Sequence, residues 1–198
     1  MRYAALGDSY TIGTSVEPDE RWPDQLARRL PQLALVANPA VNGYTTADLI
    51  EHELSGLEGW RSELVTVLIG VNDVVQCVAE GAYAANVELI LDRLAAEVGA
   101  DRVVAVAVPD YTVTPRGADY GDPDQRRAAI ERVNAAMAEA CEERGVAFVP
   151  DPWEISRRAA DDPSLVADDG LHPSGAQYRL WVDAIEPVVR RCLEGAGW

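Results

Sequence analysis

The sequence contains no lysine, and all 17 of its basic residues are arginine. This absence excludes a P-loop lysine, a Schiff-base lysine and a serine–lysine dyad as the basis of any chemistry. Long hydrophobic runs are absent too: Val103–Val108, one of the longest, has six residues, whereas a membrane helix needs about 20. We therefore expect no segment that spans a membrane.

Cysteines are few. Cys77, Cys141 and Cys192 are widely spaced and form no CxxC pair, so we interpret them as three buried thiols rather than as a disulfide framework. The N-terminus also lacks the extended apolar core and the small-residue cleavage site of a signal peptide. These two observations predict a cytoplasmic protein.

Positive charge is scarce, because 17 basic residues face 33 acidic ones and the formal net charge is −16. Such a charge repels polyanions, and no basic cluster interrupts it, so we expect a small-molecule substrate and no nucleic acid. The hydrophobic share of 48% and charged share of 25% are typical of a globular protein. A length of 198 residues predicts a single domain over residues 1–198, and the oligomeric state stays open.

Five short apolar segments alternate with longer segments in which apolar residues have helical spacing. The predicted strands are Tyr3–Leu6, Leu33–Ala37, Leu64–Ile69, Val103–Val108 and Val146–Val149. The predicted helices are Pro23–Leu30, Thr46–Leu57, Ala82–Val98, Pro123–Arg144 and Pro173–Leu193. Strands that alternate with helices in this way indicate a parallel sheet.

The alternation predicts a three-layer α/β/α sandwich of the flavodoxin-like type. Its central parallel five-stranded sheet is expected in the order 2-1-3-4-5, because right-handed crossovers leave few other arrangements. Helix starts are predicted at two residue pairs and helix ends at two glycines: Asp122-Pro123, His172-Pro173, Gly145 and Gly195. Pro187 lies inside the last predicted helix, which it should kink or interrupt.

Ligands of open α/β sheets bind outside the carboxyl ends of the strands, so the residues after each strand are candidates for a site. Gly7–Tyr10 follows the first predicted strand, Asn38–Gly43 the second and Gly70–Asp73 the third. A serine hydroxyl, a glycine and an asparagine amide are thus expected at one edge of the sheet.

A serine hydroxyl becomes a nucleophile when a base, usually histidine, takes its proton. The chain has only two histidines. His52 lies in the middle of a predicted helix between two glutamates, which indicates a solvated surface residue. His172 lies in a loop before the last predicted helix, from which it can reach the carboxyl edge of the sheet.

Asp169 precedes His172 by three residues. Across a tight turn its carboxylate can accept the Nδ1 proton of His172, which leaves Nε2 to act on Ser9. Ser9, His172 and Asp169 together make a complete catalytic triad. Such a site needs no cofactor and no metal.

An acyl-transfer site also needs donors for the oxyanion of the tetrahedral intermediate. We consider the backbone N–H of Ser9, the backbone N–H of Gly43 and the side-chain amide of Asn72. Each feature also has a purely structural interpretation. Ser9 and Asn72 can cap helices, Gly43 can belong to a plain turn, and Asp169–Pro173 can be an acidic loop before a helix. The order and place of these residues along the chain favour the catalytic interpretation.

Four short blocks resemble those of the SGNH, or GDSL, hydrolases in their expected order. They are Gly7-Asp8-Ser9, Gly43, Gly70-x-Asn72-Asp73 and Asp169-x-x-His172, and they extend over nearly the whole chain. The resemblance implies a nucleophile at Ser9, a base at His172 and its orienting acid at Asp169, with oxyanion donors at Ser9, Gly43 and Asn72. The second block departs from the usual form, because Asn42 stands where a small residue is common.

The function implied is that of a GDSL-type serine esterase or lipase that hydrolyses carboxylic esters of small or lipid-like substrates through an acyl-enzyme. We expect the pocket walls at Tyr10, at Val74 and in the segment Pro109–Pro115, which includes Tyr111. The residues do not determine the acyl chain or the alcohol of the substrate.

Three other interpretations stay open at this stage. The same site can transfer the acyl group to an alcohol other than water. A flavodoxin-like module can bind a small ligand without chemistry. Metal-assisted hydrolysis can use an acidic set near the C-terminal end, although no histidine pair accompanies it: Asp161, Asp162, Asp168 and Asp169.

Overall fold

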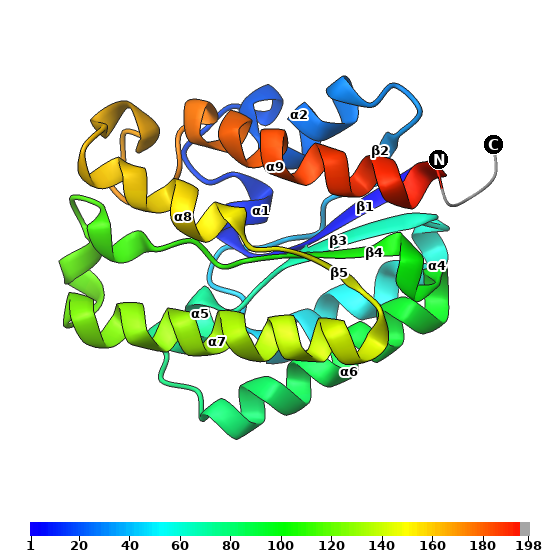
Figure 1. The fold of residues 1–198 in the computed structure, drawn as a ribbon, viewed down its shortest axis with the longest axis horizontal. Helices are drawn as coiled ribbons and strands as arrows, with labels where there is room; N and C mark the ends of the chain where they lie inside the picture. Colours follow the sequence, from blue (N-terminus) through cyan, green and yellow to red (C-terminus); the bar gives the residue numbers. More distant parts are fainter. Residues whose placement is uncertain (195–198) are drawn as a thin grey trace.

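The protein is described by a computed structural model that covers residues 1–194. Five parallel strands form one sheet in the order β2-β1-β3-β4-β5, and helices cover both of its faces (Figure 1). The strands are β1 (Arg2–Gly7), β2 (Ala34–Ala37), β3 (Leu64–Leu68), β4 (Val103–Val106) and β5 (Ala147–Val149). The predicted α/β/α sandwich and its strand order are therefore confirmed.

The α-helices flank the sheet in two layers (Figure 1). One layer holds α2, α8 and α9, in which α9 contacts both α2 and α8, and the other holds α5, α6 and α7. Their bounds are α1 (Ser9–Ile12), α2 (Trp22–Arg29), α3 (Thr46–Asp48), α4 (Leu57–Trp60), α5 (Val71–Val75), α6 (Glu80–Val98), α7 (Pro123–Arg144), α8 (Asp151–Arg157) and α9 (Gly175–Glu194).

The core lies between the sheet and these two layers. All residues of β3 and β4 are buried, whereas the edge strands β2 and β5 are mostly half-buried. Continuous apolar runs are typical of strands covered on both faces. Trp22 and Trp181 are completely buried on the side of α2 and α9, and Tyr83 is buried on the side of α6. The two layers thus hold the sheet, and with it the carboxyl ends of the strands, in place.

The local signals for α7 are confirmed. The side chain of Asp122 accepts a hydrogen bond from the N–H of Gln125 at 2.9 Å, Pro123 is the first helical residue, and Gly145 ends the helix in the left-handed region at φ +66°. Gly195, the other predicted helix end, lies outside the described residues.

The predicted helix Thr46–Leu57 is wrong as a single helix. α3 is followed by a π-helical turn over Leu49–Glu53 and a 3-10 turn over Leu54–Gly56 before α4 begins. Glu53, at the end of the π turn, is buried and accepts the N–H of Gly7. The departure from a regular α-helix thus brings the carboxyl group of Glu53 into the protein interior. π turns often occur at functional sites.

Two expectations for the last helix are also corrected. α9 begins at Gly175 and not at Pro173, because Pro173 pairs with Val166 in an isolated antiparallel bridge. α9 continues through Pro187, so the expected interruption is absent, whereas a kink at Pro187 stays a prediction. Pro187 is exposed, so the carbonyl that lacks its helical hydrogen bond lies on the solvent side and can bind water.

The three cysteines differ in exposure. Cys141 is buried and Cys192 is half-buried, but Cys77 is exposed, so the prediction of three buried thiols is wrong for Cys77. Cys77 has φ +55° in the short connection between α5 and α6, where the chain turns at the surface. No helix within residues 1–194 is both long enough and apolar enough to cross a membrane.

Candidate active site

Ser9 is positioned by the turn between β1 and α1. Gly7 has φ +149°, and a Cβ atom there would lie 2.2 Å from the carbonyl oxygen of Leu68 on β3, so only glycine permits this approach. Asp8 then caps α1, because its Oδ1 accepts the N–H of Tyr10 at 3.0 Å. Since Asp8 provides the cap, Ser9 is not the helix cap of the structural interpretation, and its hydroxyl has no hydrogen-bond partner in residues 1–194.

Asp169 and His172 are joined within one tight loop. The loop is closed by the bridge between Val166 and Pro173 and by a hydrogen bond from the N–H of Ala167 to the carbonyl of His172 at 2.8 Å. Asp169 Oδ1 accepts the N–H of His172 at 2.9 Å, and Asp169 Oδ2 lies 2.6 Å from His172 Nδ1. The fold-back of the carboxylate onto the imidazole is therefore present in the structure.

The charge of Asp169 is well satisfied. Besides the two contacts with His172, it accepts the N–H of Leu171 at 2.9 Å and the hydroxyl of Ser15 at 2.7 Å. Partial burial raises the pKa of Asp169, but these hydrogen bonds outweigh burial and hold the pKa well below its ordinary value. Asp169 is consequently ionised at neutral pH and favours the His172 tautomer that carries its proton on Nδ1.

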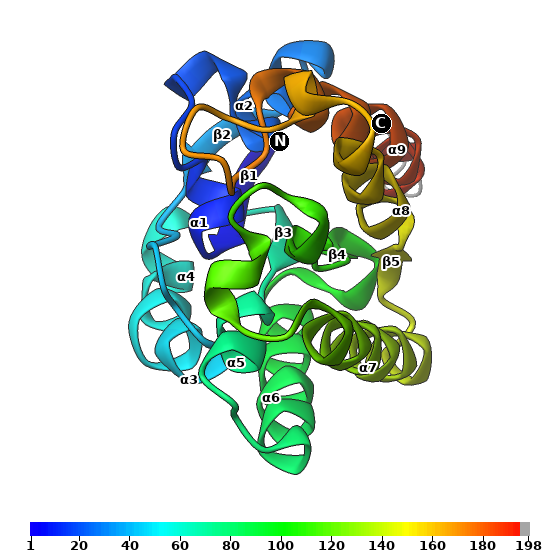
Figure 2. The ribbon, with the colours of Figure 1, turned by 90° about the vertical axis from the view of Figure 1, so that its left-hand side faces the viewer.

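Ser9, Gly43, Asn72 and His172 all line one cavity of about 260 Å³. Figure 2 looks onto the end of the molecule where α1 and α5 meet the segment that follows β4. The remaining lining residues are Tyr10, Asn42, Val71, Val75, Tyr111, Tyr120 and Leu171. Within the described residues, no hydrogen bond joins the hydroxyl of Ser9 to the ring of His172. Catalytic hydrogen bonds are often long in a site without substrate.

The cavity also contains hydrogen-bond donors that the protein itself leaves free. Gly43 has φ +86° and is exposed, and the N–H groups of Gly43 and Ser9 make no hydrogen bond within residues 1–194. The side-chain amide of Asn72 donates one hydrogen bond to the carbonyl of Tyr44 at 2.9 Å, and its second N–H stays available. Three donors thus surround one cavity.

Asn72 is not a helix cap, in contrast to the structural interpretation. The cap position of α5 belongs to Gly70, and Asn72 is the second residue of the helix. Asn72 instead holds the loop that carries Gly43, because it binds the carbonyl of Tyr44. Gln76, one turn further along, donates to the carbonyl of Gly43 at 3.3 Å. Two side chains from α5 and its C-terminal end therefore bind the backbone at Gly43 and Tyr44.

Two of the expected pocket residues line the cavity and one does not. Tyr10 and Tyr111 line it, whereas Val74 lines a different cavity between α5, α6 and α7. The correction follows from helix geometry: Val71 and Val75, four residues apart, share one face of α5, and Val74 points elsewhere. The sequence could have identified this pair, because Val71 is the neighbour of Asn72 and Val75 follows Val71 by four residues, which is about one helical turn.

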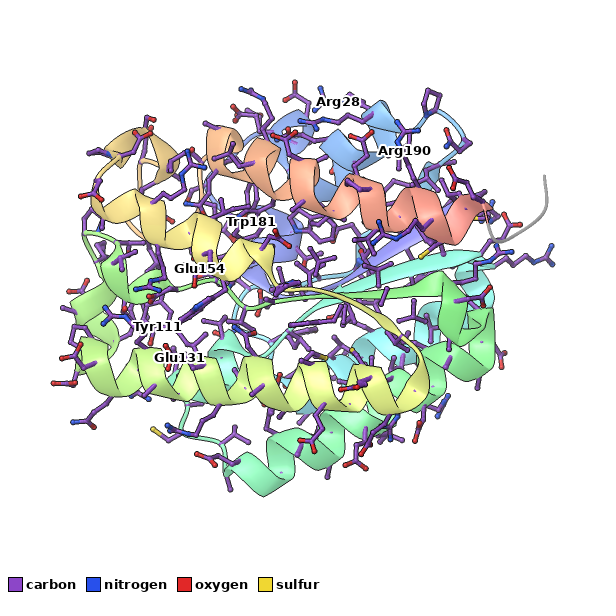
Figure 3. The ribbon with its side chains drawn as sticks, viewed as in Figure 1. Arg28, Tyr111, Glu131, Glu154, Trp181 and Arg190 are labelled. Carbon is purple, nitrogen blue, oxygen red and sulfur yellow. The ribbon has the colours of Figure 1, made fainter. Side chains whose placement is uncertain are left out.

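Asp110 precedes Tyr111 and caps the 3-10 turn over Tyr111–Val113 that carries it. Asp110 is completely buried, accepts hydrogen bonds from the N–H and the hydroxyl of Thr112, and pairs with Arg127 at 3.1 Å. The hydroxyl of Tyr111 is buried and has no hydrogen-bond partner within residues 1–194, and burial raises its pKa to about 12. Figure 3 shows Tyr111 in the segment between β4 and α7. The ring of Tyr120 lies edge-on to the ring of Tyr111, with 5.8 Å between the ring centroids.

Other candidates from the sequence lie outside this site. His52 is exposed, as predicted, and packs its ring near Tyr44 at 5.6 Å between centroids. In the part of the chain that the structure describes, no three His, Cys, Asp or Glu side chains converge in a way that could hold a metal ion. The acidic set of the metal-assisted interpretation therefore forms no metal site: Asp161, Asp162, Asp168 and Asp169.

Comparison with known proteins gives a family match and several solved structures of similar fold. Residues 5–180 match the model of the GDSL-like lipase/acylhydrolase family. No curated protein matches the sequence. The structure of TesA is 18% identical and covers 97% of this chain and 99% of its own, with a TM-score of 0.75.

Two further solved structures have the same fold. A lipase/acylhydrolase from Enterococcus faecalis is 20% identical with a TM-score of 0.73, and 96% of each chain is covered. Axe2, an acetylxylan esterase from Geobacillus stearothermophilus, is 18% identical with a TM-score of 0.71, and covers 95% of this chain and 93% of its own. Because the family match covers most of the sequence, the chain belongs to the GDSL-like lipase/acylhydrolase family and is an ester-bond hydrolase.

Proposed function

We propose that the protein is a serine esterase that uses Ser9 as nucleophile, His172 as general base and Asp169 as the acid that orients His172. The observation that carries the proposal is the 2.6 Å contact between Asp169 Oδ2 and His172 Nδ1, in a ring that shares its cavity with Ser9. This contact engages Nδ1 of His172 and leaves Nε2 free to act as the base for the Ser9 hydroxyl, which supports the proposal.

In the first half of the reaction, Ser9 Oγ attacks the ester carbonyl while His172 takes the hydroxyl proton. The oxyanion is held by the N–H groups of Ser9 and Gly43 and by the amide of Asn72, all of which lack another partner for the bonds concerned. The tetrahedral intermediate collapses, His172 returns the proton to the leaving alcohol, and an acyl-Ser9 ester remains. Water, deprotonated by His172, then releases the acid by the same steps.

The cavity favours an ester with a short acyl group. Its volume of about 260 Å³ is below the roughly 300–1,000 Å³ of pockets that hold drug-sized ligands. The walls supplied by Val71, Val75 and Leu171 are apolar, and Tyr111 and Tyr120 stand beside them. We propose that these side chains contact the acyl group, and that the alcohol part of the substrate extends toward the exposed Gly43.

A fluorophosphonate probe tests the nucleophile directly, because it reacts covalently with an activated serine. We expect wild-type protein to be labelled and Ser9→Ala and His172→Ala to be unlabelled. Ser55→Ala is a matched control, since Ser55 is exposed and, among the residues described, its hydroxyl donates only to the carbonyl of His52. Labelling that survives in Ser9→Ala would show that another serine is the nucleophile, and no labelling of the wild type would refute the triad.

A series of p-nitrophenyl esters tests the acyl preference. We expect kcat/KM to be highest for acetate to butyrate and to fall for octanoate and longer chains, because the proposed acyl wall consists of a few small side chains, Val71, Val75 and Leu171. Product analysis in the presence of added alcohol separates hydrolysis from acyl transfer. Release of free acid as the main product supports the esterase, and a dominant new ester would favour the transferase alternative.

A further inference from the structure

Ser15 has an unusual backbone conformation for its residue type. It lies in the turn that follows α1 and has φ +66°, and only Arg61 and Cys77 share this left-handed region among the non-glycine residues of the described chain. A side chain at such a φ costs free energy, and it persists where the surroundings require it. Ser15 is exposed, so burial of its side chain does not explain the conformation.

The hydroxyl of Ser15 is directed at the carboxylate of the candidate triad. It donates to Asp169 Oδ2 at 2.7 Å, and His172 Nδ1 lies 2.6 Å from the same oxygen. The two residues are 154 positions apart in the sequence. A hydrogen bond from a neutral hydroxyl to a carboxylate is among the stronger ones in proteins, and here it opposes rotation of the carboxylate away from His172.

The turn that carries Ser15 is an extension of the helix that carries Ser9. The N–H groups of Gly13 and Thr14 donate to the carbonyl of Ser9 at 3.1 and 3.0 Å. The hydroxyl of Thr14 also donates to the side chain of Asn42, next to Gly43. This turn therefore connects the nucleophile with the loop of the base on one side and with the oxyanion loop on the other.

We propose that Ser15 is a positioning residue, which acts through Asp169 to hold His172 in register with Ser9. The inference rests on the proposed function. The covalent connection from Ser9 to Ser15 and the hydrogen bond from Ser15 to Asp169 form a short rigid path between nucleophile and base. The hydroxyl that completes this path belongs to a residue with a left-handed φ.

Ser15→Gly removes the hydroxyl and relieves the backbone strain at the same time. We expect kcat to fall about 10-fold for the best p-nitrophenyl ester while KM stays unchanged, since misalignment of the base affects the chemical step. The melting temperature should stay near the wild-type value, because relief of the left-handed backbone offsets the lost hydrogen bond. Arg61→Gly is the matched control: it relieves the same strain in an exposed residue before β3, and should leave kcat unchanged.

Ser15→Asn and Ser15→Asp form a second matched pair. Both side chains tolerate the left-handed region, but only asparagine carries an N–H donor for Asp169, whereas aspartate repels it. We expect Ser15→Asn to keep kcat within about 3-fold of the wild type and Ser15→Asp to lose at least as much as Ser15→Gly. A proton NMR resonance of His172 Nδ1–H should shift in Ser15→Gly and return toward its wild-type position in Ser15→Asn.

Fluorophosphonate labelling and ester turnover of the wild type distinguish failure of the positioning role from failure of the proposed function. A wild type that is labelled at Ser9, together with a Ser15→Gly variant of unchanged kcat, would overturn the positioning role alone. The same conclusion would follow if asparagine and aspartate at position 15 gave equal rates, or if KM and not kcat changed. A wild type without labelling would overturn the proposed function and the positioning role together.

Discussion

Glu53 is a buried carboxyl group directly beneath the strand that leads to Ser9, and its titration should be visible in the stability of the protein. Its side chain is 1% exposed. Oε2 accepts the N–H of Gly7 at 3.0 Å, and Oε1 has no partner within residues 1–194. Burial raises the pKa of Glu53 from 4.5 to about 8, the Gly7 N–H opposes the rise, and the nearby Asp8 adds to it.

The direction of the pH effect follows from these values. In the unfolded chain Glu53 loses its proton near pH 4.5, whereas in the folded protein it keeps the proton to about pH 8. Between these limits unfolding releases a proton, so the free energy of unfolding falls by about 1.4 kcal/mol per pH unit for this group. From pH 5.5 to pH 8.5 the loss amounts to about 3 kcal/mol. The stabilising contribution is complete below about pH 4.5 and is lost as pH rises through 8.

Glu53→Gln removes the titration and keeps an oxygen that can accept the Gly7 N–H. We expect the free energy of unfolding, measured by urea denaturation and circular dichroism, to fall about 3 kcal/mol less in this variant than in the wild type between pH 5.5 and pH 8.5. Asp8, whose pKa burial also raises to about 8, interacts with Glu53, so the difference between the two proteins reports the titration of Glu53 together with its effect on Asp8. Glu58→Gln, at an exposed position on α4, should follow the wild-type pH dependence. Parallel pH curves for Glu53→Gln and the wild type would refute the reasoning.

Three other variants test the site and its support. Asp169→Asn should lower kcat by about 10⁴-fold without loss of folded structure, because the wrong tautomer of His172 is favoured; near-wild-type turnover in an ester assay would contradict the triad. Asn72→Ala should lower kcat by about 100-fold through loss of an oxyanion donor, and a change confined to KM would contradict this role. Gly7→Ala should destabilise the protein by about 3 kcal/mol or more in urea denaturation, since its Cβ would lie 2.2 Å from the Leu68 carbonyl oxygen; unchanged stability would mean that β1 and β3 can separate.

The order of the strands and the local part of the candidate triad were accessible from the sequence. Continuous apolar runs such as Val103–Val108 identify strands buried on both faces, and the handedness of crossovers then restricts their order. Asp169 and His172 are three residues apart, so a single tight turn brings the carboxylate to the imidazole. Ser9 follows the first strand directly. Each of these inferences depends on contacts within a few residues or on a general rule of topology.

Other features depend on how distant segments pack and carry no local signal. In the sequence, Glu53 looks like an exposed residue of a surface helix. It is buried only because its π turn packs against Gly7. Val74 was expected at the cavity, but the rotation of α5 against α7 turns it away.

By itself, the sequence determined the alternation of strands and helices, the serine at the end of the first strand and the histidine with an aspartate three residues before it. Only the tertiary structure decided which side chains surround them, and Ser15 is the clearest case. Its hydroxyl meets Asp169 across 154 positions, and no pattern within either segment predicts that contact. The physical reason is that hydrogen bonds act over about 3 Å in space, whereas sequence patterns report only the geometry of one element at a time.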